Sequence, residues 1–178
     1  MAFAGGGCST VGGIDAAATA GVSNADAVAT LSYIWSGARD AINGAKESPK
    51  ASFNIPVSLS GECPGGGSRN YSGTISGTNV GGSGTATVHI TAALNKCGYD
   101  QTTTITTIDA PAVTVTGTIA IVSDAYGAST LTLTVPALTV NSVSCTGGIA
   151  MSLVATSPSS QPTATGTICG RSGAIPVP

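Results

Sequence analysis

The first regular pattern in the chain has the spacing of a helix. From residue 28 onward, apolar or small residues recur at steps of three and four, which places them on one helical face. Ser23 with Asp26 three positions later resembles a capping box, and Pro49 blocks continuation. We therefore predict a helix over residues 23–47. Its apolar face packs either on the chain's own sheet or on a neighbouring subunit, as a candidate assembly face of Val28, Leu31, Trp35, Gly37, Ala41, Ile42 and Ala45.

From residue 51 onward the pattern changes to a period of two. Apolar side chains alternate with threonine or serine in short runs separated by turn residues, which is typical of strands with one buried and one wet face. Pro56 confines the first of these strands to a sheet edge or a bulge. The predicted strands cover residues 53–59, 71–75, 86–94, 103–108, 113–122, 130–140, 150–155 and 163–168.

Together these elements predict a mainly β fold. We expect a disulfide-stapled β-sandwich, barrel or short solenoid, formed by residues 51–178 and preceded by one amphipathic helix. Residues 1–22 are rich in glycine and alanine. They are expected to form a flexible arm or a donor strand that adds to a neighbour's sheet.

The four cysteines of the β region form two similar brackets. Cys63 opens the first in the sequence C-P-G-G, and Cys97 closes it with C-G; Cys145 opens the second with C-T-G-G, and Cys169 closes it with C-G. This similarity predicts an internal duplication of about residues 60–98 and 143–170. We expect two disulfides, which indicate an oxidising compartment, and no metal site, because close cysteine pairs and neighbouring histidines are missing. Four cysteines allow three pairings, of which the repeat favours Cys63–Cys97 with Cys145–Cys169.

The fifth cysteine, Cys8, ends a stretch of small residues near the start of the sequence. This stretch resembles a degenerate bacterial lipobox, although Gly5 stands where leucine is usual. Cys8 is therefore a candidate for lipidation or for an intermolecular link. We expect contact with a membrane only through such a lipid, because no apolar run reaches the length of about 18 residues that spanning requires.

Charged side chains are scarce. They make up 8% of the 178 residues, and the formal net charge is −2. With six Lys and Arg side chains in total, the chain has no basic field for nucleic acid. Residues 101–170 carry only Asp109 and Asp124. Because natural sheets usually guard their edges with charge, we expect these strands to be covered within the fold or to pair with another chain.

The sequence shows no arrangement typical of an enzyme. The single histidine, His89, is in phase with Thr87 and Thr91 on the expected wet face of a strand. Neither a G-x-S-x-G motif nor a glycine-rich phosphate loop is present. We therefore expect no catalytic residues and no cofactor. The Thr-x-Thr runs are similar to those of ice-binding β-proteins, but threonine is also simply a good strand former.

The pattern from Gly61 to Gly170 resembles small secreted, often lipid-anchored, β-rich bacterial surface proteins with paired C-x-G-G and C-G cysteines. Most of those proteins have no assigned function, so the resemblance implies location and architecture only. We predict a non-enzymatic extracellular structural subunit that assembles with copies of itself into a filament or surface layer. The contacts would come from β edges and the N-terminal arm or helix. The alternative is a lipid-anchored outer-membrane or periplasmic module that binds an apolar ligand or a sugar.

Overall fold

The computed structural model describes residues 21–45, 51–101, 104–157 and 160–177. These residues form one helix followed by strands that all belong to a single antiparallel sheet. The elements are α1 (Asn24–Gly44), β1 (Ser52–Glu62), β2 (Ser68–Val80), β3 (Ser83–Gln101), β4 (Thr104–Val122), β5 (Ala125–Val135), β6 (Thr139–Val140), β7 (Val143–Ser144), β8 (Ile149–Ala155), β9 (Thr163–Ile168) and β10 (Arg171–Pro176). The mainly β, disulfide-stapled fold with one preceding helix is thus confirmed.

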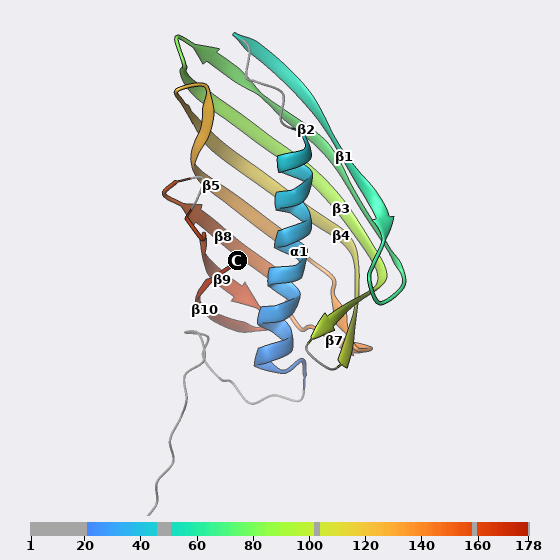
Figure 1. The fold of residues 1–178 in the computed structure, drawn as a ribbon. Helices are drawn as coiled ribbons and strands as arrows, with labels where there is room; N and C mark the ends of the chain where they lie inside the picture. Colours follow the sequence, from blue (N-terminus) through green and yellow to red (C-terminus); the bar gives the residue numbers. More distant parts are fainter. Residues whose placement is uncertain (1–20, 46–50, 102–103, 158–159, 178) are drawn as a thin grey trace, which may run out of the picture.

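The sheet is open and curved. Its strands follow the order β1-β2-β3-β4-β5-β8-β9-β10, and the short β6–β7 hairpin branches off β4. Figure 1 shows α1 lying across one face of this sheet, which we call the inner face; the opposite one is the outer face. The sandwich, barrel and solenoid alternatives thus resolve into one curved sheet with a helix on its inner face.

Glycines on the inner face allow the strands to bend. Gly117 in β4 and Gly166 in β9 have φ angles of 147° and 150°, which side-chain-bearing residues rarely adopt. A Cβ at either position would run into a carbonyl oxygen of the neighbouring strand. Such glycine kinks are a known source of sheet curvature. Here they lie in the sheet that curves past α1.

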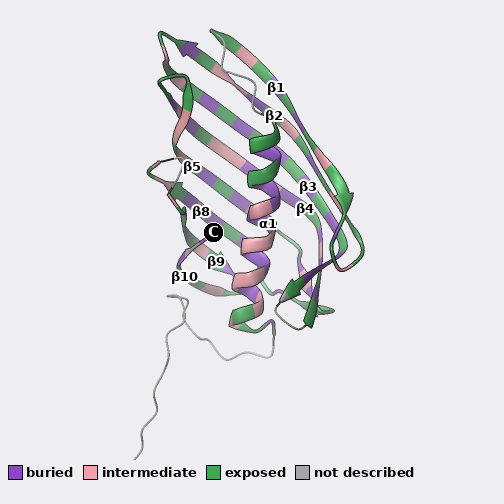
Figure 2. Ribbon diagram, viewed as in Figure 1, coloured by how far each residue is buried: buried purple, intermediate pink, exposed green. Residues whose placement is uncertain are grey.

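The core lies between α1 and the inner face. Figure 2 shows buried and exposed residues alternating along the strands, as the period of two predicts. In β5, for example, Leu131, Leu133 and Val135 are buried, while Thr130 and Thr132 are exposed. The apolar side of each long strand therefore faces the helix, and the threonine side faces away from it.

The helix begins as its sequence predicts. Ser23 is the N-cap, and its hydroxyl oxygen accepts a hydrogen bond from the Asp26 amide at 3.1 Å. The described helix ends at Gly44, and residues 46 and 47 of the predicted helix lie outside the described residues. So do Cys8 and all of the predicted N-terminal arm except residues 21 and 22. Val22 is buried, and its carbonyl accepts a hydrogen bond from Arg171 of β10 at 2.6 Å.

The candidate assembly face of the helix is instead part of the chain's own core. Leu31, Trp35, Gly37, Ala41 and Ile42 are buried, and the sheet provides the partner surface. Val28 and Ala45 are half-buried and pack against the same core. The intramolecular alternative is therefore the correct one for this face, because an apolar sheet of this size needs a covering layer.

The strand predictions are wrong in several places, and the two-residue strand β7 is among those not predicted. Of the predicted strands 103–108 and 113–122, residue 103 lies outside the described residues, and the rest belong to one strand, β4, because Pro111 lies where the β3–β4 register shifts. A bulge leaves a residue unpaired, so proline costs no ladder hydrogen bond there. The predicted strand 130–140 ends at Val135, before Pro136, and resumes as β6. The last strand, β10, is missing from the prediction because Gly173 and Ala174 weaken its alternation.

The two disulfides join the pairs that the repeat favours. Cys63–Cys97 ties the end of β1 to β3, and Cys145–Cys169 ties the segment before β8 to the end of β9. In each C-x-G-G segment, the amide of the fourth residue donates to the carbonyl of the cysteine, from Gly66 to Cys63 and from Gly148 to Cys145. Both bridges therefore close beside a tight glycine turn.

Replacing Gly37 by alanine is expected to destabilise the protein. The new Cβ would lie 2.6 Å from Cζ and 2.9 Å from Cε2 of the buried Tyr71 ring. Overpacking of this kind costs about 1–3 kcal/mol, which exceeds the gain of about 0.8–1 kcal/mol in helix propensity. Denaturant unfolding of Gly37→Ala should therefore give a lower free energy of unfolding. Gly44→Ala is the matched control, because a Cβ there would meet no atom of another described part of the chain within 4 Å. A Gly37→Ala variant as stable as this control would contradict the described packing.

Removing either disulfide as a pair should lower the free energy of unfolding by about 2–4 kcal/mol, because each bridge restricts the unfolded chain. We propose Cys63→Ala with Cys97→Ala, and separately Cys145→Ala with Cys169→Ala, measured by urea unfolding. Alanine avoids placing an unpaired hydroxyl at Cys97, which is fully buried. An unchanged unfolding midpoint in both double variants would show that the bridges do not hold the native sheet.

Candidate functional site

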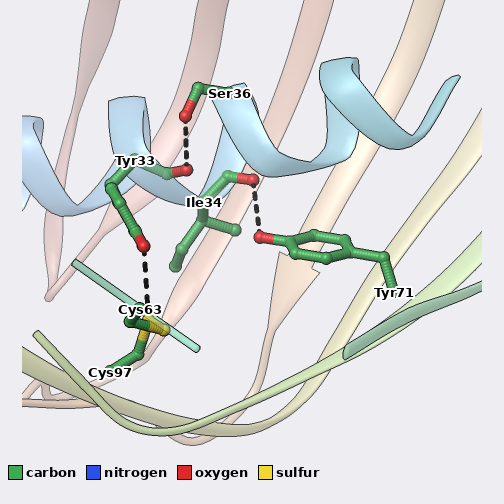
Figure 3. Close-up of a disulfide and its surroundings, with 6 residues drawn as sticks. All are labelled: Tyr33, Ile34, Ser36, Cys63, Tyr71 and Cys97. Atoms are coloured by element: carbon green, nitrogen blue, oxygen red, sulfur yellow. Dashed lines mark hydrogen bonds between the residues drawn. A yellow bond between two sulfur atoms is a disulfide. The ribbon is translucent and has the colours of Figure 1, made fainter. Parts of the chain in front are cut away.

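Titratable side chains meet inside the molecule where α1 crosses β2 and β3. Figure 3 shows Tyr33 and Tyr71 on either side of the helix segment around Ile34. The Tyr71 hydroxyl donates to the Ile34 carbonyl at 3.2 Å, and the Tyr33 hydroxyl lies 3.4 Å from Sγ of Cys97. The Tyr33 ring also stacks on Tyr99, with ring centroids 4.6 Å apart.

The pKa values of the tyrosines in this cluster indicate a structural role in the contact between helix and sheet. Burial raises the pKa of Tyr71 well above its usual value, and the positive charge of Arg69 offsets only part of that. Burial also raises the pKa of Tyr33, again against the effect of Arg69. A raised pKa keeps both phenols protonated, so neither is activated as a base or nucleophile. The cluster therefore fixes the helix to the sheet through neutral hydroxyls.

His89 lies on the outer face, exposed as the sequence predicts. Its cross-strand neighbours are Thr74 and Thr116, so it has no carboxylate partner in the register. It belongs to a row of mostly hydroxyl-bearing side chains that crosses six strands: Thr74, His89, Thr116, Thr132, Ser152 and Thr165. Among the described residues, no three His, Cys, Asp or Glu side chains are grouped as a metal site requires.

A shallow hollow of about 390 Å³ lies on the outer face over β3, β4, β5 and β8. Its lining combines hydroxyl groups with methyl groups and contains neither a charged nor an aromatic side chain: Thr85, Thr118, Ala120, Ala128, Ser129, Thr130, Val154, Ala155 and Thr156. Ligand sites usually add a few converging polar groups or stacking rings to such a surface. The hollow therefore offers weak recognition at most.

The two outermost strands, β1 and β10, carry the most specific recognition features. They lie at opposite margins of the sheet, and each pairs with one neighbour only among the described residues. An edge strand presents unpaired N–H and C=O groups, which form a template for another strand. Which residues present them follows from the hydrogen bonds at the strand ends.

In β1, the backbone N–H and C=O groups of the even-numbered residues point to the open edge of the sheet, away from β2. In an antiparallel pair, alternate residues bond to the partner strand and the residues between them face away. The Asn79 amide donates to the Ala51 carbonyl at 3.3 Å, and the Cys63 amide to Gly67 at 3.1 Å. The odd-numbered residues, like Ala51 and Cys63, therefore form hydrogen bonds with β2. Pro56 is even-numbered, so the position of its missing N–H is on the open side of β1.

In β10, too, the backbone N–H and C=O groups of the even-numbered residues point to the open edge, away from β9. The Val177 amide donates to the Pro162 carbonyl at 2.9 Å, which places the odd-numbered residues on the β9 side. Ser172, Ala174 and Pro176 therefore face the open edge. Each edge thus carries one proline at an outward position, the arrangement that lets proline limit but not abolish pairing.

The segment 101–170, which carries only the two charges of Asp109 and Asp124, does not form these edges. The longer strands within it, β4, β5, β8 and β9, are each paired on both sides. Pairing within the fold, which was one of the two alternatives, explains why these strands carry so few charges. The prediction from Pro56 is confirmed, since β1 is an edge strand. Pro176 gives the same signal for β10, but the strand itself was not recognised.

No family model, curated protein or solved structure matches this chain. The resemblance to bacterial surface proteins therefore rests on the cysteine pattern alone. No described helix is long and apolar enough to cross a membrane. Two disulfides indicate an oxidising compartment.

The raised tyrosine pKa values predict a loss of stability in alkaline solution. Below about pH 10, both the folded and the unfolded chain keep their tyrosines protonated. Above it, the unfolded chain loses protons that the half-buried Tyr33 and the buried Tyr71 retain, so the free energy of unfolding falls as pH rises. Urea midpoints across this range should show the fall, and Tyr71→Phe should make it shallower. An equally steep fall in Tyr71→Phe would show that Tyr71 ionisation does not contribute.

Proposed function

We propose that the protein is a non-enzymatic structural subunit of an extracellular assembly, a filament or surface layer built from copies of the same chain. The observation that carries this proposal is the pair of open edges at β1 and β10, with backbone groups directed outward on both. Strand pairing between chains needs such groups and needs no side-chain chemistry. The partner is therefore another copy of this chain.

The completed core supports the same proposal. Since α1 already covers the inner face, association is not required to bury that apolar surface. A subunit of this kind can fold alone and join others afterwards. The disulfides suit an oxidising location, and the cysteine pattern resembles that of bacterial surface proteins, so we place the assembly outside the cell or on its surface.

The alternative function is that of a lipid-anchored binding module for an apolar ligand or a sugar. The outer-face hollow favours it, but the lining lacks the aromatic rings on which sugars stack. The inner face is also occupied, because Tyr71 and the helix residues Leu31 and Ile34 fill it. A diacylglyceryl mass on Cys8 in native protein would support this alternative.

Native protein is expected to form particles larger than a monomer, and the assembled fraction should rise with protein concentration. Size-exclusion chromatography with light scattering gives the mass, and negative-stain microscopy shows the shape. Cys8→Ser is the matched control, because it removes intermolecular disulfides through Cys8 and leaves the sheet edges intact. Assembly should persist in Cys8→Ser. A stable monomer at high concentration, or oligomers lost in Cys8→Ser, would contradict the proposal.

A further inference from the structure

We propose that neighbouring copies join head to tail, with the open side of β10 in one copy pairing antiparallel with the open side of β1 in the next. This inference rests on the proposed function and adds the geometry of the contact. The sheet would then continue from copy to copy.

The directions of the two edge strands are compatible with continuation. Eight strands lie on the path from β1 to β10, and every neighbouring pair is antiparallel. Because eight is even, β1 and β10 run in opposite senses. A second copy in the same orientation therefore places its β1 antiparallel to β10 of the first. The junction repeats the relation that already exists between neighbours within the sheet.

The faces are compatible as well. Residues that oppose each other in an antiparallel pair share one face of the sheet. The residues of β1 whose backbone groups face the open edge, such as Asn54 and Ser58, have exposed side chains, and so have Ser172 and Ala174 of β10. Pairing them continues the outer face. The same pairing brings the buried Ile175 into line with the apolar inner row of β1.

The prolines select the register. Each facing pair exchanges two hydrogen bonds, and a proline can only accept. Placing Pro56 opposite Pro176 would leave that pair with no hydrogen bond. The best register leaves Pro56 beyond the end of β10 and gives about five hydrogen bonds. Its facing pairs are Glu62 with Ser172, Ser60 with Ala174, and Ser58 with Pro176.

Head-to-tail pairing is the contact that can propagate. Pairing of β1 with a second β1 is also antiparallel, but it closes a two-fold dimer and leaves β10 open on both copies. Extension would then need β10 to pair with β10, where Pro176 would face Ser172 at both ends and about four hydrogen bonds remain. A heterologous contact uses both edges in every copy. Because sheets twist, repetition of this contact would generate a helical filament.

Cysteine cross-linking tests the junction. In the Cys8→Ser background, a Ser60→Cys variant is mixed with an Ala174→Cys variant, assembled and mildly oxidised. Peptide mapping should identify an intermolecular link between positions 60 and 174, together with the native Cys63–Cys97 and Cys145–Cys169 bridges. The matched control replaces Ser60→Cys by Asn54→Cys, which lies on the same strand and face. In the proposed register it is about 20 Å from position 174, at about 3.4 Å per residue, and should not react.

The outcomes separate the two proposals. A 60–174 link without a 54–174 link supports the head-to-tail register. Links formed by Ser60→Cys alone would indicate β1–β1 pairing, and equal reaction of Asn54→Cys would indicate another register; both overturn this inference. Assemblies that form without any of these links overturn the edge junction and leave the structural-subunit proposal standing. A protein that stays monomeric overturns both.

Discussion

Tyr71 of β2 packs against α1 at Gly37, and its hydroxyl donates to the Ile34 carbonyl in the same turn of the helix. This close approach sets the distance between the helix and the inner face of the sheet. A side chain at position 37 would hold the two layers apart and open the core along the helix. Most other features follow from the resulting contact, since the apolar side of every long strand is directed at α1. Among the described residues, α1 thereby covers the apolar inner face.

With the inner face covered, the sheet itself keeps two kinds of accessible surface. One is the outer face, whose side chains are mostly small, neutral and hydroxyl-bearing. The other is the pair of strand edges, where the backbone itself offers directional hydrogen bonds. The edges are the more specific of the two, because their donors and acceptors have fixed spacing and their prolines break that spacing at known positions. This asymmetry is why the proposed function is assigned to the edges.

The sequence predicts the secondary structure better than the surfaces of interaction. The helix start at Ser23, the edge position of Pro56 and the two disulfide pairs follow from local signals: a cap, a missing donor and a repeated cysteine bracket. The direction in which the helix face packs does not follow, because an apolar stripe has the same sequence whether it meets its own sheet or another chain. The continuity of β4 through Pro111 does not follow either, since a proline in a bulge and a proline in a loop have the same sequence signal. The β10 edge was missed because glycine and alanine carry little alternation.

The neutral outer face has a consequence for behaviour in solution. Charged surfaces keep protein molecules apart by mutual repulsion, and added salt weakens that repulsion. The Thr74–Thr165 row carries hydroxyl groups and one imidazole where such surfaces carry carboxylates and amines. Water bound to those hydroxyls is then the main barrier between two approaching faces. Simple salts near physiological strength should therefore change the colloidal behaviour of this protein little, whereas strongly hydrated solutes that withdraw water from surfaces should change it greatly.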